Sequence, residues 1–456
     1  MAMAAALNTR VAAARSLRSV EIVWLALAAG VLLFFTSSSI YSDTARTVAG
    51  TTVAAAAYVL LTVNGRPGPR HVVITIWSLL LALGMVVPTI GGKGAVSAIF
   101  TPSPHQLTTA AYILCAAVWG AICAARPVTD LSNLVVARET AAAKLPIWPL
   151  CLPLGMFIIA AGGPGALWSR SSYLFGSGSN MLFVFSTSLT LPCACVLAYK
   201  FAVGESAKVR TAAALALGAY FLLFLSQASR RLAVATVAVT AIRLLFGAKR
   251  HRKAIAVFGL WFSLVTLSLP LTLRSGTHHG LSSYLPKLTT ESLRVSSGPK
   301  IFASNVGFAY PLAGVVATDP RKEAKAALAT SLSPLPGGMV GWPTVSRQLR
   351  INVYTPFSGM GELGQAGLPA VFIYTLLATT VFQVLAVRAC KLRESLRAPC
   401  FLLYLGLSGF FALSVLQYNL RSASRLAYYA VIVGIGLAGT QLLPARHPSS
   451  SRTTSG

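Results

Sequence analysis

Hydrophobic residues in this chain occur in long runs rather than in the short amphipathic or alternating patterns of soluble domains. Short polar or basic segments separate the runs. A bilayer's hydrocarbon core is crossed by about 20 residues of α-helix, and a helix satisfies its own backbone polar groups there. The pattern therefore predicts an all-α, polytopic integral membrane protein.

About twelve of these runs approach the length of a transmembrane helix. They are Val20–Ile40, Val48–Val63, Val72–Ile90, Leu107–Ala125, Pro146–Gly162, Met181–Ala202, Thr211–Ala228, Leu232–Phe246, Ala254–Leu273, Leu363–Val387, Pro399–Gln417 and Leu426–Leu443. No cleavable signal peptide is predicted, because the first run is long enough to remain in the membrane.

One long segment, residues 274–362, contains no comparable apolar run. Residues 1–456 are predicted to form a single membrane domain, and this segment is its long periplasmic loop. Residues 444–456 are predicted to form a flexible cytoplasmic tail. Within the loop, Asp319 as N-cap and Pro320 at the first helical position predict a helix through Ser331. The preceding stretch Ile301–Thr318 is apolar but contains glycines and a proline, and we expect it to dip into the membrane interface.

Composition and charge sharpen this picture. Hydrophobic residues make up 55% of the chain and charged residues 11%, whereas a soluble domain has about 25% charged residues. With a cytoplasmic N-terminus, 22 of the 38 basic residues lie inside and 7 lie in short outer loops. Short cytoplasmic loops are enriched in Lys and Arg, so both termini are predicted to be cytoplasmic in a bacterial inner membrane. Since most basic residues are then topogenic, no nucleic-acid partner is expected.

An arginine pair follows Ser229 in the two-residue turn between the seventh and eighth spans. Arg230 and Arg231 lie on the predicted outer face, where guanidinium groups are suited to clamp a phosphate or another anion. The alternative is a solvated turn whose arginines extend to lipid head groups.

Further arginines lie on the same predicted face. The last outer loop contains Arg421 and Arg425, and the long loop contains Arg347 and Arg350 among its basic residues. Positive charge outside the membrane is not explained by topology, and it suits an anionic lipid-linked substrate. Generic attraction to anionic lipids, including head-group contacts by Arg421 and Arg425, is the alternative interpretation.

A glycine-rich segment closes the long loop and contains Glu362. A carboxylate at a helix N-terminus is favoured by the helix dipole and can bind free amides, which is the main interpretation. A role as general base is the second. Early in the loop, His278 and His279 are interpreted as a solvated pair, with acid–base chemistry as the alternative.

The sequence contains no pattern typical of a cofactor or metal site. It has no Walker-type loop, no GxGxxG beside a strand and no metal-ligand spacing of His, Asp and Glu. Cys193 and Cys195 lack such partners and are interpreted as packing residues. No metal or cofactor is therefore expected.

The layout resembles the bacterial O-antigen polymerase family, with its oligosaccharide-repeat-unit and exopolysaccharide polymerase relatives. The features shared are a mid-chain helix ending in Ser229-Arg230, one long late periplasmic loop, and the return through Gly361-Glu362 with Gly364 and an apolar span. They cover about residues 215–440. The family usually has a bulky residue soon after the glutamate, where this chain has Leu363-Gly364-Gln365.

The resemblance implies a GT-C-like, metal-independent glycosyltransferase that polymerises undecaprenyl-pyrophosphate-linked repeat units into O-antigen or exopolysaccharide. It implies a pyrophosphate contact for Arg230, with Arg231 beside it, and a motif role for Glu362. Four further arginines are candidate pyrophosphate or glycan contacts because they lie on the same predicted outer face: Arg347, Arg350, Arg421 and Arg425. The partners are lipid-linked glycans and membrane lipids, with a chain-length regulator and a flippase as further candidates.

Two other functions fit the same layout. An O-antigen ligase-type enzyme, which transfers a finished glycan to a lipid core, also uses a long basic outer loop. A secondary transporter or lipid-linked oligosaccharide flippase is the alternative from another class. Such a transporter would need charged or polar groups at mid-membrane depth, and the centres of the predicted spans contain almost no charges.

Overall fold

The structure is a computed structural model, and it describes residues 68–91, 102–124, 146–172, 181–246, 251–291, 308–319, 324–351 and 357–442, apart from 205, 230, 275, 276 and 393. These residues form helices and contain no strand. The helices are α3 Pro69–Gly91, α4 Pro104–Cys123, α6 Trp148–Ala160, α7 Pro164–Trp168, α8 Met181–Val203, α9 Ala207–Ser226, α10 Arg231–Phe246, α11 Arg252–Arg274, α12 Leu281–Glu291, α14 Ala309–Ala317, α15 Ala324–Leu332, the 3-10 turn η4 Gly337–Val340, α16 Trp342–Leu349, α17 Gly359–Gln365, α18 Leu368–Ala389, α19 Glu394–Gln417 and α20 Leu420–Leu442.

Five of these helices are long and apolar enough to cross a membrane. The segments are Pro104–Cys123, Met181–Val203, Ala207–Ser226, Leu368–Ala389 and Leu396–Gln417. An α-helical membrane protein is therefore consistent with the described part of the chain. The predicted spans Val20–Ile40 and Val48–Val63 and the tail 444–456 lie outside the described residues, so the count of twelve stays a prediction.

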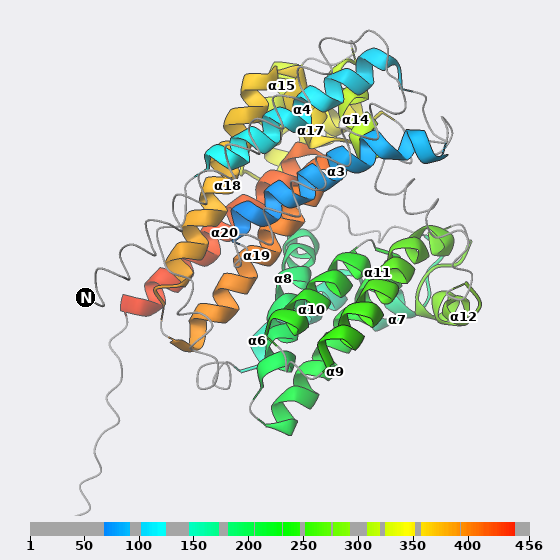
Figure 1. The fold of residues 1–456 in the computed structure, drawn as a ribbon, viewed down its shortest axis with the longest axis vertical. Helices are drawn as coiled ribbons and strands as arrows, with labels where there is room; N and C mark the ends of the chain where they lie inside the picture. The colour runs from blue at the N-terminus through cyan, green and yellow to red at the C-terminus, as the bar shows by residue number, and fades with distance from the viewer. Residues whose placement is uncertain are drawn as a thin grey trace, which may run out of the picture.

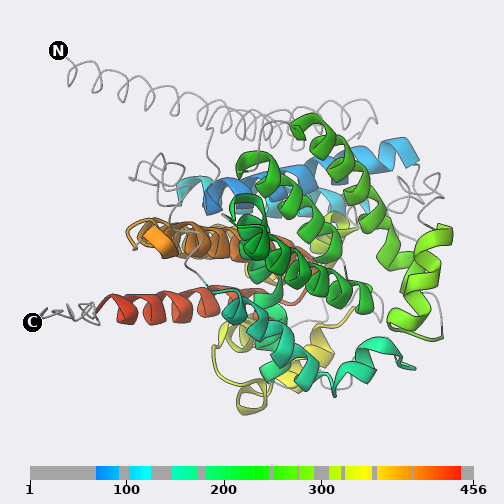
Figure 2. The same ribbon diagram turned by 90° about the horizontal axis from the view of Figure 1, so that it is seen from below.

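The helices form two groups (Figures 1 and 2). In one, α3, α4, α18, α19 and α20 pack together, with α14, α15 and α17 at one end. In the other, α6, α8, α9, α10 and α11 pack together, with α7 and α12 beside them. Helix α8 joins the two groups through its long contact with α19.

Small residues allow α4 to approach its neighbours closely. A Cβ atom added at Gly120 would lie 2.1 Å from Thr375 Oγ1 and 2.5 Å from the Phe372 carbonyl oxygen of α18. One added at Gly314 of α14 would lie 1.8 Å from the Gln106 carbonyl oxygen of α4. Because helices in a bilayer associate mainly by such close packing, these glycines hold α4 tightly against α18 and α14.

A buried arginine fixes the C-terminal end of α4. Arg70 is 3% exposed, and its Nε donates to the Ala121 carbonyl oxygen at 3.2 Å while Nη2 donates to that of Ile122. The cation therefore satisfies carbonyls in the last turn of α4, where the helix dipole favours positive charge. The backbone N–H of Arg70 also donates to Gln383 of α18 at 3.2 Å, so α3, α4 and α18 meet here.

The structure bears on three predictions about the long loop. Glu362 does not open the tenth span, because α17 ends before Gly367, whose φ of +98° breaks the helix. The stretch before Thr318 forms α14 despite Pro311, which lies in the first turn where a proline is tolerated, and it is buried against α4 and α17. The helix predicted after Asp319 and through Ser331 agrees with α15 over the described residues, and its predicted start at residues 320–323 lies outside them.

Replacing Gly120 with Ala is expected to lower the free energy of unfolding in detergent by about 1–3 kcal/mol, because the new methyl group meets backbone atoms of α18. Gly218→Ala is the matched control. It lies in α9 with nothing within 4 Å of an added Cβ, so the variant gains helix propensity without a clash. Equal thermal stability of the two variants would contradict the close α4–α18 contact.

Candidate functional site

Glu362 lies where three chain segments meet. Its side chain is 5% exposed, and Oε2 accepts hydrogen bonds from the Ser331 hydroxyl at 3.2 Å and from the Leu420 N–H at 3.3 Å. Leu420 is the first residue of α20. The carboxylate therefore binds an amide at a helix N-terminus, as the sequence predicted, but the helix is α20 rather than its own.

The glycines around Glu362 allow this approach. A Cβ atom at Gly359 would lie 2.9 Å from Leu420 Cα, and one at Gly361 would lie 2.5 Å from Val316 Cβ. Ser358 begins α17 by accepting the Gly361 N–H at 3.3 Å. The Gly-Glu motif therefore has a physical reason, because α17 fits between α14 and α20 only without side chains at these positions.

Arg421 follows Leu420 in α20 and binds the same part of the long loop. It is 2% exposed, and Nη1 donates to the carbonyl oxygens of Thr330 at 2.6 Å and Ser333 at 3.2 Å. Its Nη2 donates to the Leu335 carbonyl oxygen. These carbonyls lie in and just beyond the last turn of α15, so Arg421 caps this helix.

The charge of Arg421 is held in an environment with little water. Burial lowers the pKa of its guanidinium, and the neighbouring charge of Arg425 lowers it further, yet an arginine remains protonated in proteins. The guanidinium carbon also lies 5.6 Å from the centre of the Trp342 ring at the start of α16, a cation–π geometry. The main role of Arg421 is therefore to hold α15 and α16 against α20.

The other predicted arginines differ in their surroundings. Arg347 and Arg350 are exposed on α16 and at its end, and Arg425 is half-buried in α20. Arg231 lies 4.6 Å above the Phe410 ring of α19, two turns before that helix ends at Gln417. Arg230 lies outside the described residues.

The turn that leads to Arg231 has an unusual backbone. Helix α9 ends in two closing bonds, from Ala228 N–H to Leu225 O at 2.8 Å and from Ser229 N–H to Phe224 O at 3.0 Å. This motif normally has glycine at the left-handed position, but here Ala228 has a φ of 42°. Such a residue stores about 1–3 kcal/mol of strain, which the surrounding contacts must offset.

Arg170 supplies one of these contacts, and sequence reasoning missed it. Its Nη2 donates to the Ser226 carbonyl oxygen at 2.7 Å. Its backbone pairs with His279 through N–H to O bonds of 2.8 and 2.9 Å. The available signal was an arginine in a short predicted outer loop, against the usual charge bias. Arg170 thereby ties the end of α9 to the start of the long loop.

The prediction of a solvated histidine pair is wrong for His279. This residue is 5% exposed, and its Nδ1 lies 2.8 Å from the Tyr284 hydroxyl, whereas His278 is exposed. Burial lowers the pKa of His279, and the charges of Arg170, Lys287 and His278 lower it further. The backbone bridge to Arg170 draws the side chain inward, which local sequence does not reveal.

A second hydrogen-bonded pair beside Glu362 also had no sequence signal. The hydroxyls of Tyr374 in α18 and Ser424 in α20 lie 2.9 Å apart, and Tyr374 interacts electrostatically with Glu362. The Tyr428 hydroxyl donates to the Leu332 carbonyl oxygen at the end of α15. Polar side chains of α18 and α20 therefore continue from the carboxylate along the docked loop.

Metal-ligating groups do not gather in the described part of the chain. No group of three His, Cys, Asp or Glu side chains there could hold a metal ion. Cys193 and Cys195 are buried within α8 among hydrophobic neighbours, in agreement with their interpretation as packing residues.

Comparisons with protein families, curated proteins and solved structures find no match to this chain.

The burial of His279 predicts a pH-dependent stability. The unfolded chain binds a proton near the ordinary pKa of 6.5, whereas the folded chain resists protonation. The unfolding free energy contributed by this residue is therefore present above about pH 6.5 and falls as the pH decreases below it. Thermal unfolding of His279→Phe should show a weaker pH dependence between about pH 7.5 and 5 than the parent protein. His278→Gln, at the exposed neighbour, should keep most of the parental dependence, because His278 is the smallest of the causes that lower the pKa of His279. An equal slope in all three proteins would contradict this.

The contacts of Glu362 predict different effects of two substitutions. Glu362→Ala leaves the Ser331 hydroxyl and the Leu420 amide without their acceptor and should lower the unfolding free energy by about 1–3 kcal/mol. Glu362→Gln keeps an acceptor oxygen and should retain most of the stability. Limited proteolysis near residues 333–341 should therefore accelerate in the alanine variant alone. Identical digestion of both variants and the parent would refute the docking role.

Proposed function

We propose that the chain is a glycosyltransferase of the polysaccharide polymerase type, which joins undecaprenyl-pyrophosphate-linked repeat units at the outer face of a bacterial inner membrane. The observation that carries the proposal is the meeting of two candidate site residues on one segment of the long loop. Glu362, from the return of the long loop, and Arg421, from the last outer loop, both bind residues 330–335 at the end of α15. These contacts dock the long loop on the helix bundle. A loop docked in this way is suited to act as a lid over a lipid-linked substrate.

The charges of this docked unit support an anionic substrate. Arg347 and Arg350 lie in the loop, on α16 and directly after it, and Arg425 lies on α20. Glu362 is the only acidic side chain described between residues 324 and 392. Guanidinium groups bind phosphate oxygens with a matched fork. Cations that outnumber the carboxylates of the unit suit a pyrophosphate, whose negative charge increases as it departs.

In the proposed reaction an acceptor sugar hydroxyl attacks the anomeric carbon of the donor glycan. A new C–O bond forms, the bond between that carbon and the pyrophosphate oxygen breaks, and the leaving oxygen takes the electron pair. The hydroxyl proton leaves to a base, which this proposal does not assign. Stabilising the leaving charge is the task of Arg230, Arg347, Arg350 and Arg425, since fixed cations lower the barrier to such a departure.

Within this proposal Glu362 and Arg421 are positioning residues. Two hydrogen bonds hold the carboxylate, and three carbonyl oxygens hold the guanidinium, so their side chains orient the loop rather than contact a substrate. Both termini remain cytoplasmic, and a flippase and a chain-length regulator are proposed partners. The reaction is proposed to need no metal.

The test compares basic residues on the predicted outer face with basic residues on the opposite face. Each variant is expressed in a strain that lacks the gene. Arg230→Ala and the double variant Arg347→Ala/Arg350→Ala should be as abundant as the parent but should yield about tenfold less polymer. The matched control is Arg388→Ala/Lys391→Ala, because both side chains are exposed at the opposite end of α18.

The glycans that accumulate distinguish the functions. Single lipid-linked repeat units in the variant strains would support a polymerase, whereas long lipid-linked polymer would indicate a ligase. A normal chain-length ladder in all variants would refute the proposal. Transport of labelled substrate into vesicles without a glycan product would indicate a transporter instead.

A further inference from the structure

A second concentration of arginines lies at the other end of the α8–α10 group. An open cavity of about 520 Å³ is lined by Phe201, Ala207, Arg210, Thr211, Ala214, Leu215 and Arg243. These residues come from the end of α8, the start of α9 and the end of α10. The turn that contains Ser229 and Arg231 closes the opposite ends of α9 and α10, so this cavity is separate from the site described above.

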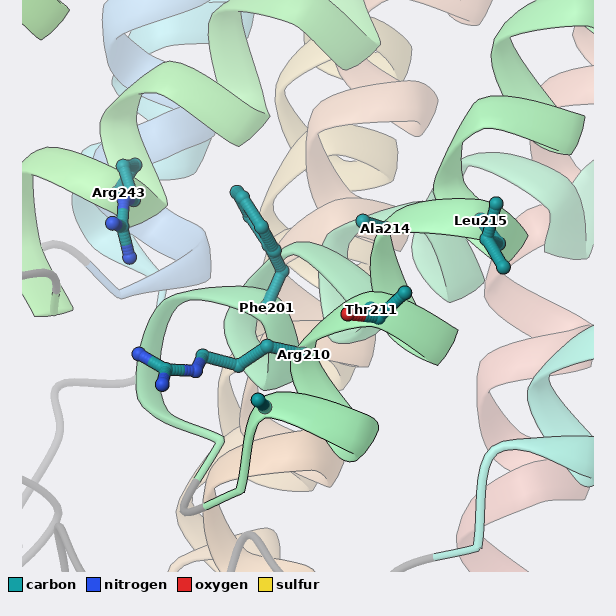
Figure 3. A pocket seen from close by; sticks show the side chains of 7 residues that line it. Phe201, Arg210, Thr211, Ala214, Leu215 and Arg243 are labelled. Atoms are coloured by element: carbon teal, nitrogen blue, oxygen red, sulfur yellow. The ribbon is translucent and has the colours of Figure 1, made fainter.

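The two guanidinium groups are presented differently. Arg243 is fixed, because its Nη1 donates to the Ala202 carbonyl oxygen at 3.2 Å and its guanidinium carbon lies 5.2 Å from the centre of the Phe201 ring. Arg210 is exposed, and its side chain makes no hydrogen bond or ion pair with any described residue. Both side chains extend to the same side of the Phe201 ring (Figure 3). Together they offer one anchored and one adjustable cation.

Acidic residues are scarce around this cavity. Between residues 140 and 290 the sequence contains a single carboxylate, Glu205, which lies outside the described residues. The exposed Lys208 adds a further positive charge on α9. The chemistry of the lining therefore favours an anion, and guanidinium pairs with a hydroxyl such as that of Thr211 suit phosphate oxygens.

The apolar side of the cavity indicates where that phosphate comes from. Leu215 is 71% exposed, and Leu222, two turns further along α9, is 46% exposed. Helix α9 is one of the five candidate spans, so its exposed apolar face is suited to contact acyl chains. A pair of arginines at the end of such a face matches a molecule with a phosphate head and a hydrocarbon tail.

We propose that this cavity binds the phosphate head group of an anionic membrane lipid through Arg210 and Arg243, with its acyl chains along the exposed face of α9. The site is independent of the proposed glycan chemistry, because it shares no residue with it. Its ligand class is a glycerophospholipid with net negative charge, such as phosphatidylglycerol.

The test uses the purified full chain in detergent, with lipid binding measured by native mass spectrometry and by the shift of the melting temperature. The double variant Arg210→Gln/Arg243→Gln should bind phosphatidylglycerol at least about tenfold more weakly than the parent. The matched control Arg388→Gln/Lys391→Gln removes the same charge from exposed positions outside the cavity and should bind like the parent. Arg210→Gln alone, which breaks no described hydrogen bond, should weaken binding if the double variant fails to fold.

Three outcomes would overturn the proposal. Equal weakening in the control variant would indicate general attraction between charges rather than a site. Equal binding of the zwitterionic phosphatidylcholine would show that net negative charge is not recognised. Stabilisation by inorganic phosphate as strong as that by phosphatidylglycerol would assign the cavity to a soluble anion.

Discussion

A buried carboxylate must be satisfied by donors, and in this chain that constraint organises the docked loop. Glu362 receives a hydroxyl from α15 and an amide from α20, and it can do so only because glycines let α17 lie against α14 and α20. Arg421 then binds the carbonyls that end α15. Loss of the carboxylate would therefore affect several helices at once, since each contact relies on the position of the next.

Two physical classes of arginine occur among the described residues. Arg70 and Arg421 are buried, and each satisfies carbonyls at the end of a helix far away in sequence. Their cost of desolvation is offset by these hydrogen bonds. Arg210, Arg347 and Arg350 are exposed and have charge available for a ligand. A count of basic residues does not distinguish these classes, but the positions of helix ends do.

Much of the helical framework could be predicted from hydrophobic runs, and α4, α8 and α9 agree with their predicted spans within a few residues. The errors lie where polar contacts override the pattern. Glu362 was expected at the entry to the tenth span because an apolar run follows it, while the break at Gly367 depends on backbone conformation. The partners of Glu362 and His279 lie on other elements, 58 residues away for Leu420, and no local signal predicts such pairs.

The cap on α15 also has a consequence for biosynthesis. Thr330 and Arg421 are 91 positions apart, so the ribosome completes α15 well before the residue that caps it has been made. Chains are made at about 5–20 residues per second, which sets the length of this interval. Until Arg421 has been made, the carbonyl oxygens at the end of α15 depend on water or on chaperones for their hydrogen bonds. The long loop can reach its final arrangement only after α18 and α19 have been synthesised, which makes its docking a late step in assembly.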